Sequence, residues 1–140
     1  METEDIPRKA YGEAKEVAGA PLMALAEQLP AVKHIHPRSM ERLGQSYGFT
    51  LYRTTLTHEA ELTSIRLVDA NDRAHVLLDG QIIATLYDRE LLVAHTFEQP
   101  VPVRAGARLE ILVENMGRVN YSFMLERQRK GIDGLSLIHI

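Results

Sequence analysis

Cysteine is absent from the 140-residue sequence, and so is any excess of basic charge. Without cysteine the chain can form neither a disulfide framework nor a thiolate metal site, and its redox compartment stays open. No apolar run approaches the roughly 18 residues that a membrane-spanning helix requires. The 16 lysines and arginines are outnumbered by 19 acidic residues and are scattered along the chain. We therefore expect neither a membrane nor a nucleic acid as a partner.

A signal-peptide pattern is also missing from the N-terminal segment. Residues 1–17, METEDIPRKAYGEAKEV, are acidic and polar, whereas a signal peptide needs a basic start and an apolar run. We expect that this chain is not exported by itself, which favours the cytoplasm. No glycine-rich phosphate loop and no Gly-x-Ser-x-Gly elbow occur, so neither a nucleotide cofactor nor a hydrolase triad is expected.

What the chain does contain is the composition of one globular domain, with 45% hydrophobic residues, 25% charged residues and a net charge of −3. From Tyr47 onward the apolar residues recur with a period of two, which is typical of β-strands. Strands are predicted over residues 47–55, 62–69, 73–87, 91–97 and 108–114. Asp79-Gly80 predicts a tight hairpin turn within the third of these ranges. Several short strands at hairpin spacing indicate an all-β jelly roll or β-sandwich.

One segment interrupts this strand pattern and another precedes it. Residues 98–107 contain two prolines and Gly106, and are predicted to separate the last two strands as a non-strand connection. Before Tyr47, the leucines of residues 20–29 stand at helical spacing between prolines, and a short helix is predicted from Ser39 to Leu43 with Ser39 as its cap. Little helix is therefore expected overall.

The last six residues, LSLIHI (135–140), alternate as a strand would. They are also the literal translation of the transposon end that is used to build many sequencing libraries. We therefore expect residues 135–140 to be adaptor-derived, and we exclude them from the predicted fold. The expectation implies that the natural reading frame continues differently beyond Gly134.

Two sets of side chains invite a catalytic or metal interpretation. Glu110 and Glu114 fall on one face of one strand, but their backbones are separated by roughly 13 Å, so a solvated face is favoured over a glycosidase pair. His34 and His36 have a spacing that some metal sites use, yet they lack further ligands nearby in sequence. We predict surface or partly buried structural histidines, no metal site and no catalytic residue in this chain.

The segment DANDR offers oxygen ligands from Asp69, Asn71 and Asp72. Such oxygens can hold a cation, but tight turns rich in aspartate and asparagine need no ion. A simple turn is the favoured interpretation.

The stretch ILVENMGRVNY (111–121) combines a buried strand with a polar turn. Leu109, Ile111 and Val113 are expected to pack inward. Asn115 to Gly117 then breaks the strand, because Gly117 is free to adopt a left-handed conformation.

The residues beyond this turn suit a sugar. Arg118 and Asn120 supply planar donors, and Tyr121 has an apolar ring with a polar tip. The alternative is that Glu114 pairs with Arg118 across the turn, that the asparagines satisfy loop backbone groups, and that Tyr121 belongs to the core. Both interpretations stay open on chemistry alone.

Three segments carry a resemblance to a known family. MERLGQSYGFTLYRT (40–54), NDRAHVLLDGQIIATL (71–86) and LEILVENMGRVNY (109–121) resemble, in this order and spacing, the first non-catalytic β-domain of β-galactosidases of glycoside hydrolase family 35. KAYGEAKEV (9–17) looks like the first strand of the same domain. The resemblance implies a galactose-binding-domain-like jelly roll over residues 9–134, preceded by a tail or linker at residues 1–8.

For function, the resemblance implies a retaining, exo-acting enzyme that removes terminal β-linked galactose. In that family both catalytic glutamates belong to a β/α barrel that precedes this domain. The implied partners are that barrel, a second β-domain of the same parent chain, and a galactoside substrate, while the chain alone is expected to be inactive. A free-standing, non-catalytic carbohydrate-binding module is the alternative.

For the site, the resemblance implies that Tyr121 reaches the galactose pocket and can contact the sugar. The residues expected to shape its loop are Asn115, Gly117, Arg118 and Asn120. The family usually has glycine after this tyrosine where the present chain has Ser122, so we expect a departure from the family pattern in the backbone angle that aims Tyr121.

Overall fold

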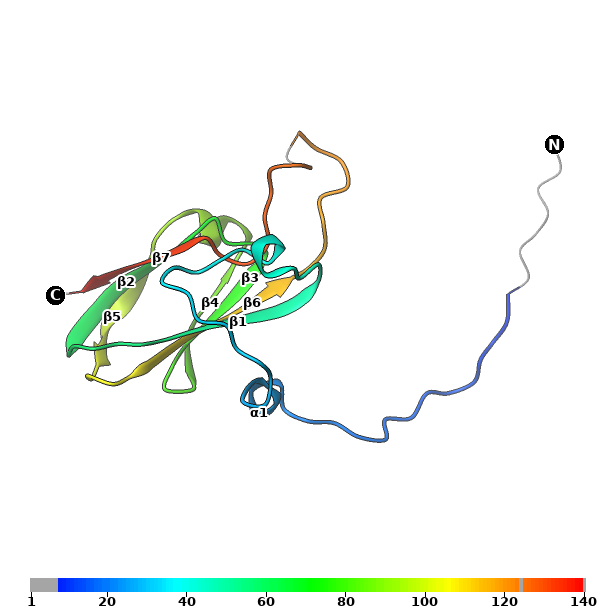
Figure 1. Ribbon diagram of the computed structural model, residues 1–140, viewed down its shortest axis with the longest axis horizontal. Helices are drawn as coiled ribbons and strands as arrows, with labels where there is room; N and C mark the ends of the chain where they lie inside the picture. The colour runs from blue at the N-terminus through cyan, green and yellow to red at the C-terminus, as the bar shows by residue number, and fades with distance from the viewer. Residues whose placement is uncertain (1–7, 124, 140) are drawn as a thin grey trace. The chain divides into compact units, whose positions relative to one another are not determined.

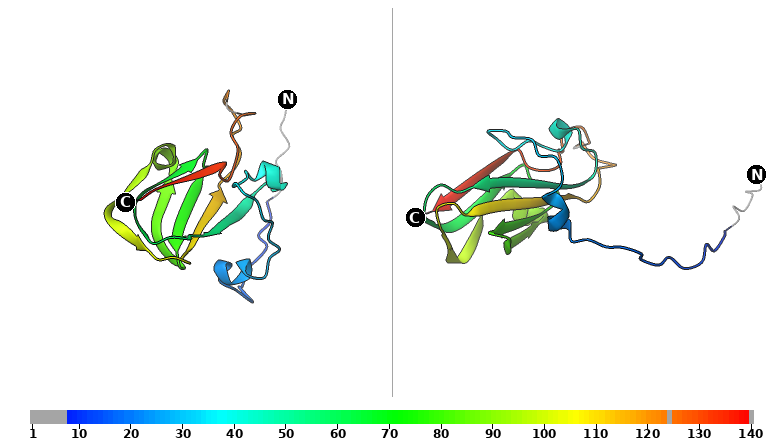
Figure 2. Two further views of the ribbon diagram at one scale, coloured as in Figure 1. Left: turned by 60° about the vertical axis from the view of Figure 1, so that its left-hand side comes forward. Right: turned by 60° about the horizontal axis from the view of Figure 1, so that its bottom comes forward.

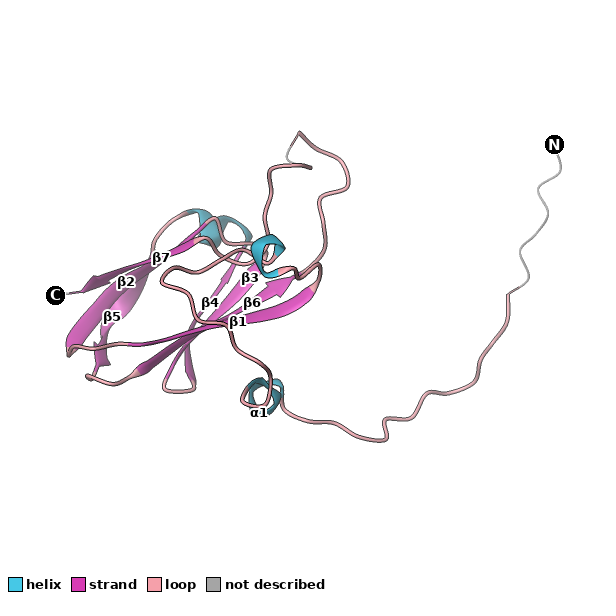
Figure 3. Ribbon diagram, in the orientation of Figure 1, coloured by secondary structure: helices cyan, strands magenta, loops and turns pink. Residues whose placement is uncertain are grey.

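The structure of the protein is a computed structural model, and it describes residues 8–123 and 125–139. Nearly all its regular structure is antiparallel β-sheet, as Figures 1 and 3 show. The strands are β1 Gly48–Thr55, β2 Ala60–Val68, β3 Arg73–Leu78, β4 Gln81–Tyr87, β5 His95–Val103, β6 Arg108–Asn115 and β7 Gly134–His139. The prediction of an all-β sandwich with little helix is confirmed.

Two sheets form the sandwich (Figure 2). The four-stranded sheet has the order β1-β6-β3-β4, and the three-stranded sheet has the order β5-β2-β7. Strand β6 pairs on one side with β1, where Tyr52 faces Ile111, and on the other side with β3, where Val76 faces the same residue. Because β6 is central in its sheet, the loop that follows it begins next to both neighbouring strands.

The core lies between the sheets and follows the alternation of the strands. Leu109, Ile111 and Val113 of β6 are at most 2% exposed, so the prediction that they pack inward is confirmed. They meet Ile65 and Leu67 of β2 in one apolar cluster. Burial of such side chains contributes about 1.5–3 kcal/mol each, which makes this alternation the main source of the fold's stability.

The hairpin between β3 and β4 is also confirmed. Asp79 and Gly80 take φ angles of +48° and +83°, as a type I′ turn requires. The Asp79 carboxylate accepts the Arg108 N–H at 2.9 Å, and this hydrogen bond lowers the pKa of Asp79. The turn is therefore held against the start of β6.

The connection predicted at residues 98–107 is wrong. Strand β5 runs through Pro100 and Pro102, and Pro102 stands opposite Glu61 of β2. Proline is tolerated there because β5 is an edge strand and needs no donor on its outer side.

The predicted strand at residues 91–97 begins too early. The 3-10 helix η2 covers Asp88–Leu92, and the Glu90 side chain accepts the Tyr87 N–H at 3.0 Å to cap it. Leu91 is buried at 5% exposure and belongs to the core cluster. Leu91 is thus an apolar residue that packs against the core from a helical turn and not from a strand.

The contacts divide the chain into two units, and the first reaches Ala31. Its helix α1 spans Leu22–Ala26, within the segment where the leucine spacing predicted a helix. The strand expected at residues 9–17 is wrong: the described part of the chain has no strand there. This segment is exposed, charged and without the apolar alternation that would bury one face of a strand.

The second unit begins at Val32 and contains both sheets. A 3-10 helix, η1, covers Glu41–Leu43, so the short helix predicted there begins later. Its N-cap is Met40 without a side-chain hydrogen bond, so the prediction that Ser39 is the cap is wrong. Ser39 and Met40 are both buried, and their segment is held by the Met40 N–H, which donates to the Lys130 carbonyl at 2.7 Å.

Strand β7 occupies most of the segment that we expect to be adaptor-derived, and pairs with β2 from Leu135 opposite Leu67 to Leu137 opposite Ile65. Ile140 and residues 1–7 of the expected tail lie outside the described residues. None of the helices in the described part of the chain is long and apolar enough to cross a membrane.

Candidate functional site

The candidate site is the loop that joins β6 to β7, which Figure 3 colours as loop and Figure 1 shows extending beyond the strand ends. Asn115 shapes its first turn, because its Oδ1 accepts the Gly117 N–H at 3.0 Å and its Nδ2 donates to the Ser46 carbonyl at 3.0 Å. Gly117 has a φ angle of +132°, which favours glycine. These two residues set the direction in which the loop leaves β6.

Arg118 ties the loop to the segment that precedes β1. Its guanidinium forms an ion pair with Glu41 of η1 and donates to the Ser46 carbonyl at 3.2 Å. Burial would raise the pKa of Glu41, but hydrogen bonds from the Arg118 side chain and the Lys130 N–H outweigh it, so the pKa lies below its ordinary value of 4.5. The Glu41 carboxylate is therefore ionised at neutral pH.

Tyr121 points to solvent and is 94% exposed. Asn120 beside it is exposed as well. The alternative that Tyr121 belongs to the core is therefore wrong. The alternative pairing of Glu114 with Arg118 is also wrong, because Glu114 forms its ion pair with Arg73 of β3.

The five residues that were assigned to the site fall into two groups. Asn115, Gly117 and Arg118 lie together at the base of the loop and contact the segment before β1. Asn120 and Tyr121 lie further along, on its exposed part. The base is thus fixed by contacts, and the aromatic ring is presented outward.

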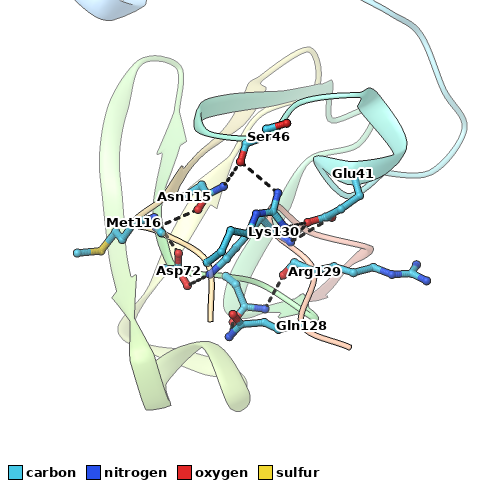
Figure 4. Close-up of polar contacts among 11 residues, drawn as sticks. Glu41, Ser46, Asp72, Asn115, Met116, Gln128, Arg129 and Lys130 are labelled. Atoms are coloured by element: carbon cyan, nitrogen blue, oxygen red, sulfur yellow. Dashed lines mark hydrogen bonds and ion pairs between the residues drawn. The ribbon is translucent and has the colours of Figure 1, made fainter. Parts of the chain in front are cut away.

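Three further residues hold this loop, and sequence analysis did not assign them to the site (Figure 4). They are Glu41, Asp72 and Lys130. Asp72 Oδ1 lies 2.6 Å from Lys130 Nζ, and Asp72 Oδ2 accepts the Met116 N–H at 2.7 Å. Lys130 is only 2% exposed. Nothing in the basic run RQRK (127–130) marks its lysine as buried.

Asn71, next to Asp72, binds the far end of the loop. Its Nδ2 donates to the Arg129 carbonyl at 2.9 Å, and its Oδ1 accepts from Gln128 Nε2 at 3.2 Å. Its backbone exchanges two hydrogen bonds with Gly131, at 3.1 and 3.0 Å. The DANDR segment therefore acts across the fold, which neither a local turn nor a cation site predicts.

A cavity of about 580 Å³ opens between η2 and the base of the loop. Its polar lining includes Asn71, Asp72, Gln128 and Lys130, and its apolar lining includes Leu91, Met116 and Val119. Asn71, Asp72 and Lys130, which hold the loop, therefore also form part of the wall of a concave surface beside it.

The two candidate carboxylates of β6 are both paired with arginine. Glu110 is fully buried and accepts from Arg53 Nε at 2.8 Å, so the solvated-face interpretation is wrong for this residue. The reason is its register, because Arg53 of β1 stands directly opposite Glu110 and covers it. Arg108 Nε lies 3.4 Å from its other oxygen.

His34 and His36 are exposed, as expected for surface histidines. In the part of the chain that the structure describes, no group of three or more histidine, aspartate or glutamate side chains is arranged to hold a metal ion.

Comparison with known proteins gives one matching family model. The model described as "Beta-galactosidase, first all-beta domain" matches residues 37–138. The matched range includes η1, the whole β6–β7 loop and both sheets except the last residue of β7, His139.

Curated relatives agree with this match. The chain is 35% identical over 139 residues to a human protein named beta-galactosidase, a match that covers 94% of this chain and 20% of the relative. The mouse protein of that name is 39% identical over 124 residues, covering 82% and 18%. A beta-galactosidase from Xanthomonas manihotis is 37% identical over 97 residues, covering 69% and 15%. The chain spans about a fifth of the length of the curated relatives that it matches.

Proposed function

The chain belongs to the β-galactosidases as their first all-β domain, and from this premise we propose that it is the accessory β-domain of a retaining exo-β-galactosidase. In this proposal the parent chain hydrolyses terminal β-galactosides. The reaction takes place in a catalytic β/α barrel elsewhere in the parent, and this domain packs on the barrel and lines its pocket. A second β-domain of the same parent is a further partner.

The arrangement of the carboxylates supports a catalytic centre outside this chain. Glycoside hydrolysis needs two carboxyl groups with different protonation states that flank one bond. In β6, Glu110 is buried against Arg53 and Glu114 pairs with Arg73. Neither is presented to a substrate, so the described residues of β6 offer no such pair.

The observation that carries the proposal is the exposed aromatic side chain on a fixed loop. Tyr121 is 94% exposed and Phe123 is 85% exposed, while the base of the loop is tied to Glu41 and Asp72. Large apolar groups held out into water are typical of a surface that another protein surface covers. We infer that the barrel covers this loop in the parent.

A role for Tyr121 in sugar contact follows from its chemistry. The ring can stack on the apolar C–H face of galactose, while its hydroxyl can exchange hydrogen bonds with sugar hydroxyls. Loss of one such contact is expected to reduce kcat/KM roughly 10-fold. The reduction is expected to be larger for Tyr121→Ala than for Tyr121→Phe, because Tyr121→Ala also removes the ring. Steady-state kinetics of both variants, made in the complete parent enzyme, test this expectation. Unchanged kinetics would leave the loop a packing role only.

A free-standing carbohydrate-binding module is the competing function, since the exposed ring of Tyr121 is open to a sugar in the isolated chain as well. Titration calorimetry of the 140-residue chain with galactose and lactose separates the two. We expect no measurable heat, because a single exposed ring binds weakly without the rest of a pocket. Saturable binding would favour the module, and release of galactose by this chain alone would overturn the accessory role.

A further inference from the structure

One carboxylate holds both ends of the β6–β7 loop. Asp72 lies in the turn between β2 and β3, and its Oδ2 accepts the N–H of Met116, the first residue after β6, at 2.7 Å. Its Oδ1 lies 2.6 Å from Nζ of Lys130, which stands near the other end of the loop. Figure 4 shows the side chain between these two partners. Asp72 therefore joins the start of the loop to its end.

A second carboxylate repeats this arrangement. Glu41 pairs with the guanidinium of Arg118 near the start of the loop. The same side chain accepts the Lys130 N–H through both oxygens, at 3.0 and 3.2 Å. Asp72 and Glu41 come from different segments, but each binds one group at either end of the loop. We call these two carboxylates the clamp.

Lys130 is the residue that both carboxylates share. Its side chain is 2% exposed and that of Asp72 is 20% exposed, so the ammonium group is buried and depends on its partner. A buried ion pair adds little net stability relative to apolar packing, but a geometry that separates the two partners leaves a buried charge uncompensated, which is strongly unfavourable. The clamp is therefore suited to fixing a conformation.

The described part of the segment that the clamp fixes has no regular structure of its own. Its described residues from Met116 to Arg129 include no helix and no strand, so ladder hydrogen bonds do not order them. An exposed ring such as Tyr121 on a segment of this kind samples many orientations unless its ends are held.

We propose that Asp72 and Glu41 are positioning residues that, through the buried Lys130, hold the β6–β7 loop in the geometry in which Tyr121 meets its target. The identity of that target, a galactoside in the barrel pocket, rests on the proposed function. The ordering of the loop is a property of this chain alone.

The test uses Asp72→Asn and Glu41→Gln, with Asp79→Asn as the matched control. Asp79 of the β3–β4 hairpin makes the same kind of two-ended contact with the β5–β6 connection, since it accepts the Arg108 N–H at 2.9 Å and lies 3.2 Å from Arg104 Nη2. Glu41 lies near the surface, so Glu41→Gln provides a second variant if Asp72→Asn does not fold.

Hydrogen exchange of the 140-residue chain measures the ordering. We expect the Met116 amide in Asp72→Asn, and the Lys130 amide in Glu41→Gln, to exchange roughly 10- to 100-fold faster, as the loss of a charge-assisted hydrogen bond implies. Asp79→Asn is expected to leave both rates unchanged. Equal rates in the clamp variants and the control would overturn the proposal.

Kinetics of the complete parent enzyme with a nitrophenyl β-galactoside complete the test. A positioning role predicts roughly 10-fold lower kcat/KM in Asp72→Asn than in Asp79→Asn at matched thermal stability. Faster loop exchange together with unchanged kinetics would support the clamp and contradict the proposed role of Tyr121 in the pocket. Failure of the clamp proposal and failure of the proposed function therefore give different results.

Discussion

Gly131 packs so closely against Tyr52 that a β-carbon on Gly131 would lie 2.2 Å from the Tyr52 hydroxyl and 3.2 Å from the Met40 nitrogen. The same hydroxyl donates to the Arg38 carbonyl at 2.8 Å and accepts the Ile132 N–H at 3.2 Å. Burial raises the pKa of Tyr52 above its ordinary value. The last part of the β6–β7 loop, just before β7, is thus fixed against β1.

This contact predicts a large cost for Gly131→Ala. Gly131 has a φ angle of +85°, and the new methyl group would also collide with Tyr52 and Met40. We expect the free energy of unfolding to fall by roughly 2–4 kcal/mol, as measured by urea denaturation. Gly106→Ala is the control, because Gly106 has a φ angle of +84° but nothing within 4 Å of its would-be β-carbon. It should cost roughly 1–2 kcal/mol, and equal losses would contradict the close contact.

The buried pair of Arg53 and Glu110 makes a second prediction. Arg53→Met removes the cation closest to a fully buried carboxylate and is expected to cost roughly 3–5 kcal/mol. Replacing both residues, as Arg53→Met with Glu110→Leu, should cost clearly less, because no buried charge is left without a partner and Arg108, the other cation near Glu110, is 44% exposed. Denaturation of both single variants and the double variant gives the coupling energy. Additive losses would show that the two side chains act independently.

The lowered pKa of Glu41 predicts a dependence of stability on pH. A carboxylate whose folded pKa lies below its ordinary 4.5 stabilises the fold fully above that value, and the contribution is lost as pH falls through the folded pKa. Glu41→Gln should therefore be less stable than wild type at about pH 7, and the difference should shrink towards about pH 3. Urea titrations across this range measure it. A difference that grows on acidification would reverse the sign and contradict the ion pair with Arg118.

The exposed apolar side chains of the loop predict self-association. Met116, Tyr121, Phe123 and Leu125 are 53%, 94%, 85% and 55% exposed, a surface that we propose the barrel covers in the parent. We expect the isolated chain to associate as its concentration rises. Replacing Phe123 and Leu125 by serine should reduce association, whereas Ile82→Ser, at a 62% exposed position of β4, should not. Sedimentation velocity distinguishes these outcomes, and a wild-type monomer at high concentration would argue against a missing partner.

Strand β7 predicts that the alternation of side chains matters more than their identity for the seating of residues 135–139 in the sheet. Leu135 and Leu137 are partly buried and pack against the core, whereas Ser136 and Ile138 are exposed. Leu137→Ser is expected to cost roughly 1–2 kcal/mol and Ile138→Ser less than about 0.5 kcal/mol in denaturation experiments. Similar costs would show that the alternation is not what seats this strand.

We propose that these six residues are adaptor-derived and that β2 accepts the part of them that belongs to β7, residues 135–139, because apolar and polar residues alternate there. A ladder uses backbone groups, which any sequence supplies, and two leucines at alternate positions provide the apolar face. Sequencing of the genomic DNA tests the origin of the segment. Codons unrelated to the adaptor after Gly134 would remove this proposal.

Local patterns predicted what local forces determine. Asp79-Gly80 predicted its hairpin because few residue pairs adopt two positive φ angles at low cost. The alternation of Leu109, Ile111 and Val113 predicted the buried face of β6, because side chains along a strand point to opposite faces in turn.

Contacts across the fold could not be predicted in the same way. Lys130 and Asp72 are 58 residues apart, and their ion pair exists only because the sheets bring the β2–β3 turn beside the end of the loop. Glu110 is buried because of its register with Arg53, which the sequence of β6 alone does not specify. Tyr121 could be assigned to the loop, but its exposure depends on how the base of the loop is tied.

The prolines of β5 have a consequence for the outer boundary of the smaller sheet. Pro100 and Pro102 have no N–H to donate, and β5 is an edge strand of its sheet. An incoming chain would find acceptors there without the donors that a continuous ladder needs. Lateral growth of the sheet towards a fibril is therefore disfavoured along β5.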